Sequence, residues 1–162
     1  MFKLFTYRPL ATGVVTEIAN KSLGGSATWT GLAWDHSNGV AYATNSLGQL
    51  VEIDLATGSD GGNLLPSVPV YLAALAVHPS SGRIYVFGID GADIILYEVI
   101  RGDWTLREVE PVAGLKAGSA TENPFWDADF NDRTGELYLT AYTGGGGDAA
   151  AAEASAAAAA AL

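Results

Sequence analysis

The chain has 162 residues, none of them cysteine, and its formal net charge is −10 at pH 7 because only 8 residues are lysine or arginine. The lack of cysteine excludes disulfide bonds, thiolate zinc sites and cysteine nucleophiles. The acidic balance argues against nucleic acid and anionic lipid as partners. No stretch has the run of about 20 apolar residues, rich in Leu, Ile and Val, that a membrane span needs. We therefore expect neither nucleic-acid binding nor membrane insertion.

The first residues predict two strands, over 3–8 and 14–19, separated by the sequence Leu-Ala-Thr-Gly. The same four residues follow a strand predicted over 49–54, and the two copies lie 45 positions apart. A strand-and-turn unit that returns at such a spacing indicates a repeat architecture. We therefore expect residues 3–19 to form the second half of a four-stranded unit, and residues 20–27 to form a loop.

A longer pattern occurs three times along the chain, at 32–44, 75–87 and 128–140. In each copy two alternating apolar runs flank a polar turn that ends at a glycine, which is the signal of a β-hairpin. The turn glycines are 43 and 53 residues apart, and they are Gly39, Gly82 and Gly135. A hairpin that recurs at about 40–50 residues is typical of the blades of a β-propeller.

The pattern therefore predicts an all-β fold of the propeller type, with two complete four-stranded blades and two half-blades. The half-blades span 3–19 and 125–142, and the complete blades span 28–69 and 71–110. The strands expected in the first complete blade are 28–34, 40–44, 49–54 and 63–68, and those in the second are 71–77, 83–89, 93–100 and 104–109. A polar connection over 111–123 precedes the last half-blade, where we expect strands over 125–130 and 136–142.

Residues 144–162 form a tail rich in glycine and alanine. The tail is either a short alanine helix that Asp148 caps or a run of placeholder residues, and we expect no function of it.

Two complete blades and two complementary halves amount to three blades, whereas closed propellers have about 4–8. We therefore expect either that the chain is part of a longer propeller or that several copies complete one ring.

Four segments resemble the YVTN/NHL/quinoprotein-like group of β-propeller repeats. They are 39–45 with 50–58, and their counterparts 82–86 with 96–99. The resemblance covers residues 28–143 and, more weakly, 3–19, and it implies the propeller fold. Because this group includes enzymes, extracellular binding proteins and structural components, the resemblance implies no single function.

The acidic residues of the last hairpin are candidate metal ligands. Asp127, Asp129 and Asn131 have the 1-3-5 spacing of oxygen ligands in a calcium loop. The pattern then fails, since Asp132 stands where the loop needs glycine and Tyr138 where it needs glutamate. The repeat places Asp127 and Asp129 on an inner strand, where they would either bind calcium or another divalent cation, or simply be solvated in a central channel.

The two histidines, His36 and His78, do not suffice for a catalytic metal site, which needs a third ligand. We expect His78 to be part of a turn and not a metal ligand. The spacing does not support a catalytic triad of Ser80, His78 and Asp90.

Among the tryptophans, Trp29 and Trp126 are the candidates for ligand binding, because they lie near the starts of inner strands and so close to one rim. Trp34 aligns with Val77 and Phe130 in the repeat, and we expect it to pack between neighbouring blades.

The sequence favours a non-catalytic propeller module that binds protein or glycan and takes part in assembly, within an extracellular or particle-associated structure. Two alternatives stay open. The resemblance also admits an enzyme of the lactonase or quinoprotein type, with a cation in the channel near Asp127 and Asp129. The open half-blades alternatively indicate a structural subunit that closes its ring by strand exchange between chains, since exposed strand edges favour self-association.

Overall fold

In a computed structural model of the protein, the structure describes residues 2–4, 21–23, 28–54, 60–66, 68, 70–91, 93–116 and 127–140. Every regular element in these ranges is a β-strand. The strands are β1 (Phe2–Leu4), β2 (Lys21–Leu23), β3 (Trp29–Asp35), β4 (Val40–Asn45), β5 (Leu50–Ile53), β6 (Asp60–Asn63), β7 (Tyr71–Val77), β8 (Ile84–Asp90), β9 (Asp93–Ile100), β10 (Thr105–Lys116), β11 (Asp127–Phe130) and β12 (Leu137–Thr140). No helix in the described part of the chain is long and apolar enough to cross a membrane.

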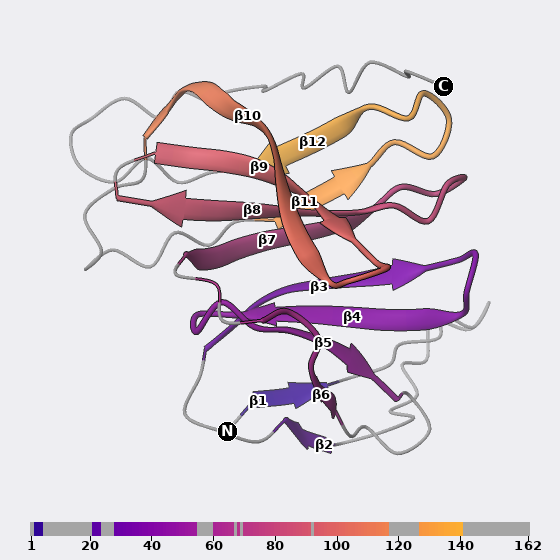
Figure 1. The fold of residues 1–162 in the computed structure, drawn as a ribbon. Coiled ribbons are helices and arrows are strands. Elements are labelled where there is room, and N and C mark those ends of the chain that lie inside the picture. The colour runs from indigo at the N-terminus through magenta and orange to yellow at the C-terminus, as the bar shows by residue number, and fades with distance from the viewer. Residues whose placement is uncertain are drawn as a thin grey trace.

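The strands form antiparallel sheets in which each strand pairs with the next along the chain (Figure 1). Strands β3 to β6 make one four-stranded sheet and β7 to β10 make another, while β1–β2 and β11–β12 are two-stranded. The all-β fold and the two four-stranded units predicted from the sequence are therefore confirmed. The strands predicted over 71–77 and 93–100 are observed with the same bounds.

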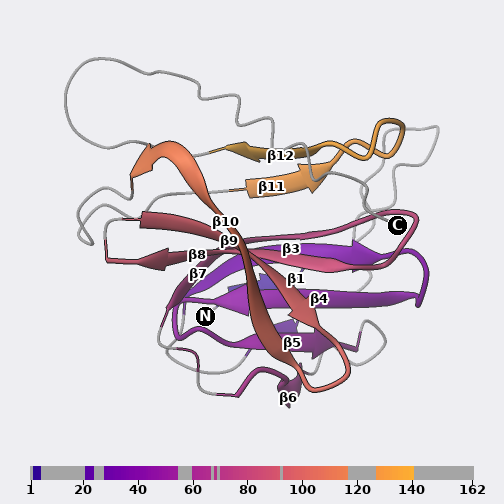
Figure 2. The same cartoon turned by 45° about the horizontal axis from the view of Figure 1, so that its top comes forward.

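The sheets pack through their first strands, and β7 lies in the middle. Strand β7 contacts β3 on one side and β11 on the other, and Figure 2 shows β11 and β12 lying over the sheet of β7 to β10. Its residues from Leu72 to Val77 are buried, as a continuously apolar strand between two sheets should be. Burying each of its large aliphatic side chains contributes about 1.5–3 kcal/mol to folding.

Two apolar clusters make up these interfaces. Between the four-stranded sheets, Tyr42 and Leu50 pack with Leu72, Leu75 and Val77. On the other face of the second sheet, the cluster joins strands β7 to β9 with β11 and β12, and includes Ala74, Phe87, Ala128, Phe130 and Leu137.

The three hairpin turns share one arrangement of hydrogen bonds. Four residues before each turn glycine, a side chain accepts a backbone N–H from inside the turn, and these side chains are Asp35, His78 and Asn131. The acceptor atoms are Asp35 Oδ1 (2.9 Å from Ser37 N), His78 Nδ1 (3.3 Å from Ser81 N) and Asn131 Oδ1 (2.9 Å from Arg133 N). The turn glycines have φ of 67°, 65° and 72°, a left-handed conformation that glycine adopts without steric cost.

The outer strands differ from the prediction. Strand β6 covers Asp60–Asn63, whereas the sequence predicted a strand over 63–68. The strand ends at Asn63 because the Asn63 side chain takes over the hydrogen bonding. Its Oδ1 accepts from Leu50 N at 3.1 Å, and its Nδ2 donates to the carbonyl of Leu65 at 2.7 Å. Leu65 is buried in the core outside any strand. Strand β10 runs to Lys116, so the expected connection over 111–123 is wrong in its first part. Bulges after Glu108 and Pro111 let this edge strand keep pairing with β9.

The two-stranded sheet of β1 and β2 also differs from the prediction. Lys21–Leu23 form strand β2 and pair with β1 in the register Phe2↔Leu23, where we expected a loop over 20–27. Backbone pairing does not require an apolar pattern, so the sequence carried no signal for it. The strand expected over 14–19 and the tail at 144–162 lie outside the described residues.

Candidate functional site

A cavity of about 330 Å³ opens where the three inner strands converge. Strands β3, β7 and β11 lie side by side, and the lining of the cavity comes from these three strands and from the hairpin turn that follows each of them. Its main polar and aromatic lining residues are Trp34, His36, Asp127, Asp129 and Asp132. Leu32, Val77 and Pro79 supply apolar surface.

Trp34 is the aromatic residue of this cavity, and the expectation that it packs between blades is wrong. Its side chain is 39% exposed and meets His36 edge-on, with ring centroids 6.3 Å apart. Its repeat counterparts Val77 and Phe130 each pack on the four-stranded sheet that precedes them. Among the described elements the two-stranded sheet of β1 and β2 precedes β3, and Trp34 belongs to none of the apolar clusters of the described residues.

The structure brings Asp127 and Asp129 together in this cavity. They alternate with buried residues along β11, so both carboxylates are on its exposed face. Each Oδ1 accepts the backbone N–H of the following residue, at 3.0 Å from Ala128 and 2.9 Å from Phe130. Asp127, Asp129 and Asp132 make the part of the lining that comes from β11 and its turn acidic.

The calcium-loop spacing does not extend to a third ligand. Asn131 uses its Oδ1 in its own turn, where it accepts from Arg133 N and, at 3.3 Å, from Thr134 N. Calcium takes about 6–8 oxygen ligands. Among the residues described, no group of three or more His, Asp or Glu side chains is arranged to hold a metal ion. A cation at Asp127 and Asp129 therefore stays a prediction.

The predicted aromatic candidates lie elsewhere. Trp29, on the first residue of β3, packs against an apolar cluster that contains Ala41, Ala43, Val51 and Ile53. Its Nε1 is buried and has no hydrogen-bond partner within the described ranges. Trp126 lies outside the described residues. Ligand binding by these two residues stays a prediction.

His78 has a structural role in its turn. Besides the hydrogen bond from Ser81, its ring stands edge-on to Phe130 with centroids 5.0 Å apart, which ties the second hairpin to β11. Ser80 Oγ lies 3.4 Å from His78 Nδ1, but Asp90 is at the opposite end of β8. The three residues do not form a catalytic triad.

Sequence reasoning missed the part of the site that β3 contributes. Leu32 and Trp34 alternate along this strand, and both are exposed in the structure. The only signal was the mismatch in the repeat: a tryptophan stands where the second blade has valine and the third phenylalanine.

Comparison with known proteins leaves the chain without a family. No family model and no curated protein matches its sequence. Among solved structures, a crystal structure described as a putative oxidoreductase (glucose dehydrogenase) from Thermus thermophilus aligns with a TM-score of 0.48 and 18% sequence identity. The alignment covers 74% of this chain and 38% of the other, so the chain spans well under half of its length. At this score and identity the likeness carries no information on activity.

Proposed function

We propose that the chain is part of a β-propeller and serves as a non-catalytic module that binds protein or glycan. The repeated four-stranded sheets, with their first strands in a row, support the propeller arrangement. The observation that carries the binding role is the cavity whose lining combines the exposed Trp34 with the acidic residues Asp127 and Asp129.

Of the two partner classes, the cavity favours a basic protein segment. An exposed indole face attracts a lysine or arginine side chain by cation–π interaction. The carboxylates of Asp129 and Asp132 add Coulomb attraction in the same cavity. The net charge of −10 steers a basic partner toward the molecule before contact.

The test is calorimetric titration of the protein with three probes: trilysine, cellotriose and calcium chloride. We expect saturable binding of trilysine. Trp34→Ala should weaken it by about fivefold, the value of one partly desolvated cation–π contact. Asp129→Asn should weaken it by an amount that shrinks at high salt, because screening reduces the charge term. Glu52→Gln removes an exposed carboxylate that does not line the cavity and should leave binding unchanged.

The other outcomes separate the alternatives. Binding of cellotriose that Trp34→Ala abolishes would assign a glycan partner instead. Calcium binding that Asp129→Asn abolishes would favour the cation-dependent enzyme. If none of the three probes binds, the cavity has no binding role of the kind proposed.

A further inference from the structure

The turn of the first hairpin contains the one Asn-Gly pair of the sequence, Asn38-Gly39. Asparagine is a heat-labile residue, and it deamidates fastest before glycine, which has no side chain to shield its backbone nitrogen. Both residues are exposed, and a Cβ at Gly39 would meet no described atom within 4 Å. The pair is therefore open to solvent on the Gly39 side. Neither residue lines the cavity around Trp34.

Deamidation of this pair requires the backbone nitrogen of Gly39 to reach the side-chain carbonyl carbon of Asn38, Cγ. The nitrogen gives its proton to a base and attacks, so a bond forms between Gly39 N and Asn38 Cγ. The bond between Cγ and Nδ2 breaks, and the amino group takes a proton from water and leaves as ammonia. Water then opens the cyclic imide that remains. Opening at the side-chain carbonyl gives aspartate, and opening at the backbone carbonyl gives isoaspartate, whose main chain contains one extra carbon.

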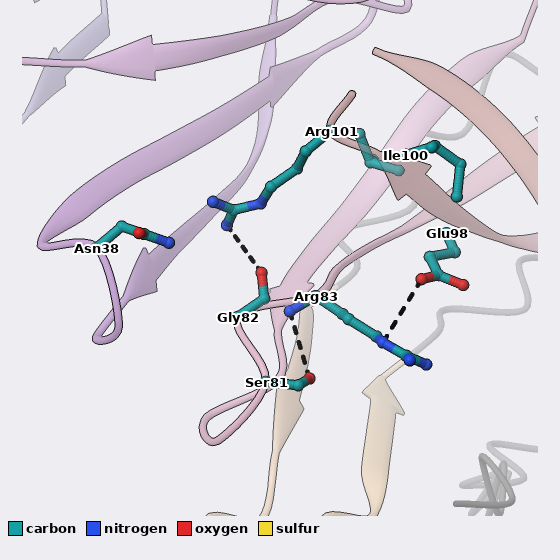
Figure 3. A pocket seen from close by; sticks show the side chains of 8 residues that line it. Asn38, Ser81, Gly82, Arg83, Glu98, Ile100 and Arg101 are labelled. Atoms are coloured by element: carbon teal, nitrogen blue, oxygen red, sulfur yellow. Dashed lines mark hydrogen bonds and ion pairs between the residues drawn. The ribbon is translucent and has the colours of Figure 1, made fainter. Parts of the chain in front are cut away.

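In the folded protein both reacting groups are held by hydrogen bonds to Asp35. The backbone N–H of Gly39 donates to the Asp35 carbonyl at 2.8 Å, so this nitrogen keeps its proton. The side-chain Nδ2 of Asn38 donates to Asp35 Oδ2 at 2.8 Å, which fixes the amide on the carboxylate. Figure 3 shows the Asn38 side chain pointing toward the guanidinium of Arg101, which donates to the same oxygen. The reaction therefore requires the turn to open first.

Either product disturbs a buried carboxylate that joins the two four-stranded sheets. Asp35 is fully buried and pairs with Arg101 of the second sheet. In the aspartate product an oxygen replaces Asn38 Nδ2, so two carboxylates meet where a donor met an acceptor, and like charges repel. In the isoaspartate product the extra carbon separates Asn38 N from Gly39 N. These two N–H groups then no longer both reach Asp35, where they bond to Oδ1 and to the carbonyl.

We propose that Asn38-Gly39 is a deamidation site that Asp35 protects while the turn is closed, and that modification there weakens the contact between the two four-stranded sheets irreversibly. A closed turn stays unmodified, whereas a turn that opens reacts and does not regain its hydrogen bonds. The chemistry needs only water and a base from solvent. It is independent of the function proposed for the Trp34 cavity.

The test is incubation of the full chain at mildly alkaline pH, once folded and once unfolded in urea. Mass spectrometry of peptides locates the modified asparagine, and enzymatic methylation measures isoaspartate. We expect Asn38 to react in urea, and to react at least about tenfold more slowly in the folded protein, because two hydrogen bonds must break first. Asn131, in the turn of the third hairpin but followed by Asp132, is the internal control and should stay unmodified.

A second measurement tests the consequence for the fold. Ion exchange separates the modified protein, which carries one more negative charge, and urea denaturation compares it with the native protein. We expect the equilibrium constant for unfolding to rise by about tenfold, because the turn loses hydrogen bonds to a buried carboxylate. Asn38→Gln is the matched control: it keeps an amide but would have to form a larger ring, so its unfolding should not change on incubation.

Three results would overturn the proposal: an Asn38 that does not react in urea, equal rates in the folded and unfolded protein, or a modified protein as stable as the native one. Because the native chain itself is incubated, no outcome depends on a variant that fails to fold.

Discussion

At the scale of single residues, Asp35 is the polar group on which the contact between the two four-stranded sheets depends. Its buried carboxylate accepts hydrogen bonds from Ser37 N, Asn38 N, Asn38 Nδ2 and Arg101. A buried charge is tolerated only when it is paired and hydrogen-bonded in this way. The ion pair with Arg101 joins residues from neighbouring sheets, so losing it weakens both the first hairpin turn and the interface.

We predict that Asp35→Asn lowers the free energy of unfolding by about 2–3 kcal/mol, because Arg101 loses its counter-charge while it stays partly buried. Burial alone would raise the pKa of Asp35, but hydrogen bonds from Asn38 and Arg101 bring it below its usual value of 3.8. The folded-state pKa is thus lower than that of the unfolded chain. The stabilisation is therefore complete above about pH 4 and is lost as the pH falls through the folded-state pKa.

Urea denaturation at a series of pH values measures both effects. The native protein should lose stability below about pH 4 more steeply than Asp35→Asn does. Asp103→Asn is the control, because Asp103 caps Thr105 in an exposed turn and its loss should cost at most about 1 kcal/mol. Equal stability of the two variants would contradict the role given to Asp35.

At the scale of elements, the close approach of β3 and β7 depends on a glycine. A Cβ at Gly31 would lie 2.7 Å from Thr44 Oγ1 and 2.9 Å from Leu75 Cβ. Next to it, Thr30 Oγ1 donates to the carbonyl of Leu72 at 2.6 Å. The two strands are therefore in backbone contact, with no room for a side chain at this position.

We predict that Gly31→Ala destabilises the protein by about 2 kcal/mol, since the extra methyl group must push β3 away from β7. Gly102→Ala is the matched control: a Cβ there meets no described atom within 4 Å, and it should change stability by less than about 0.5 kcal/mol. Thermal unfolding followed by circular dichroism compares the two. A Gly31→Ala variant as stable as Gly102→Ala would show that the sheets can move apart without cost.

The elements that the sequence predicted best are those with local signals. The turns at Gly39, Gly82 and Gly135 follow from glycine and alternation alone, and so does the buried strand β7. The outer strands β6 and β10 were predicted less well, because side-chain hydrogen bonds and bulges set where an edge strand ends. No local pattern signals contacts between sheets, such as the pairing of Asp35 with Arg101 over 66 positions.

In the candidate site, too, the features with a local sequence signal could be predicted and the others could not. The alternation of Asp127 and Asp129 on β11 could be read from the repeat, and the structure places both in one cavity. The exposure of Trp34 could not be predicted, because no pattern in the residues around Trp34 indicates whether a neighbouring sheet covers it.

At the scale of the whole molecule, the sheet of β11 and β12 differs from the sheet in the middle. Both faces of β7 are covered by neighbouring sheets. The outward face of β11 and β12 instead carries Asp127, Asp129 and Tyr138, all exposed, and β12 pairs only with β11 among the described strands. The edge of β12 that no described strand pairs with, unlike this acidic face, can pair with a strand of another copy. We therefore expect copies of the chain to associate through it.

Tyr138 provides the sharpest test of this expectation, because it is a large aromatic side chain, 48% exposed, whose hydroxyl donates to Glu136 on the same surface. A tyrosine at the centre of an interface contributes about 2 kcal/mol or more to association. We predict that Tyr138→Lys weakens self-association by at least that amount in sedimentation equilibrium and leaves the unfolding transition unchanged. Leu47→Lys, at a more exposed apolar position in the turn between β4 and β5, is the control and should associate as the native protein does. A native protein that stays monomeric at every concentration, or a Tyr138→Lys variant that associates normally, would rule out self-association at β12.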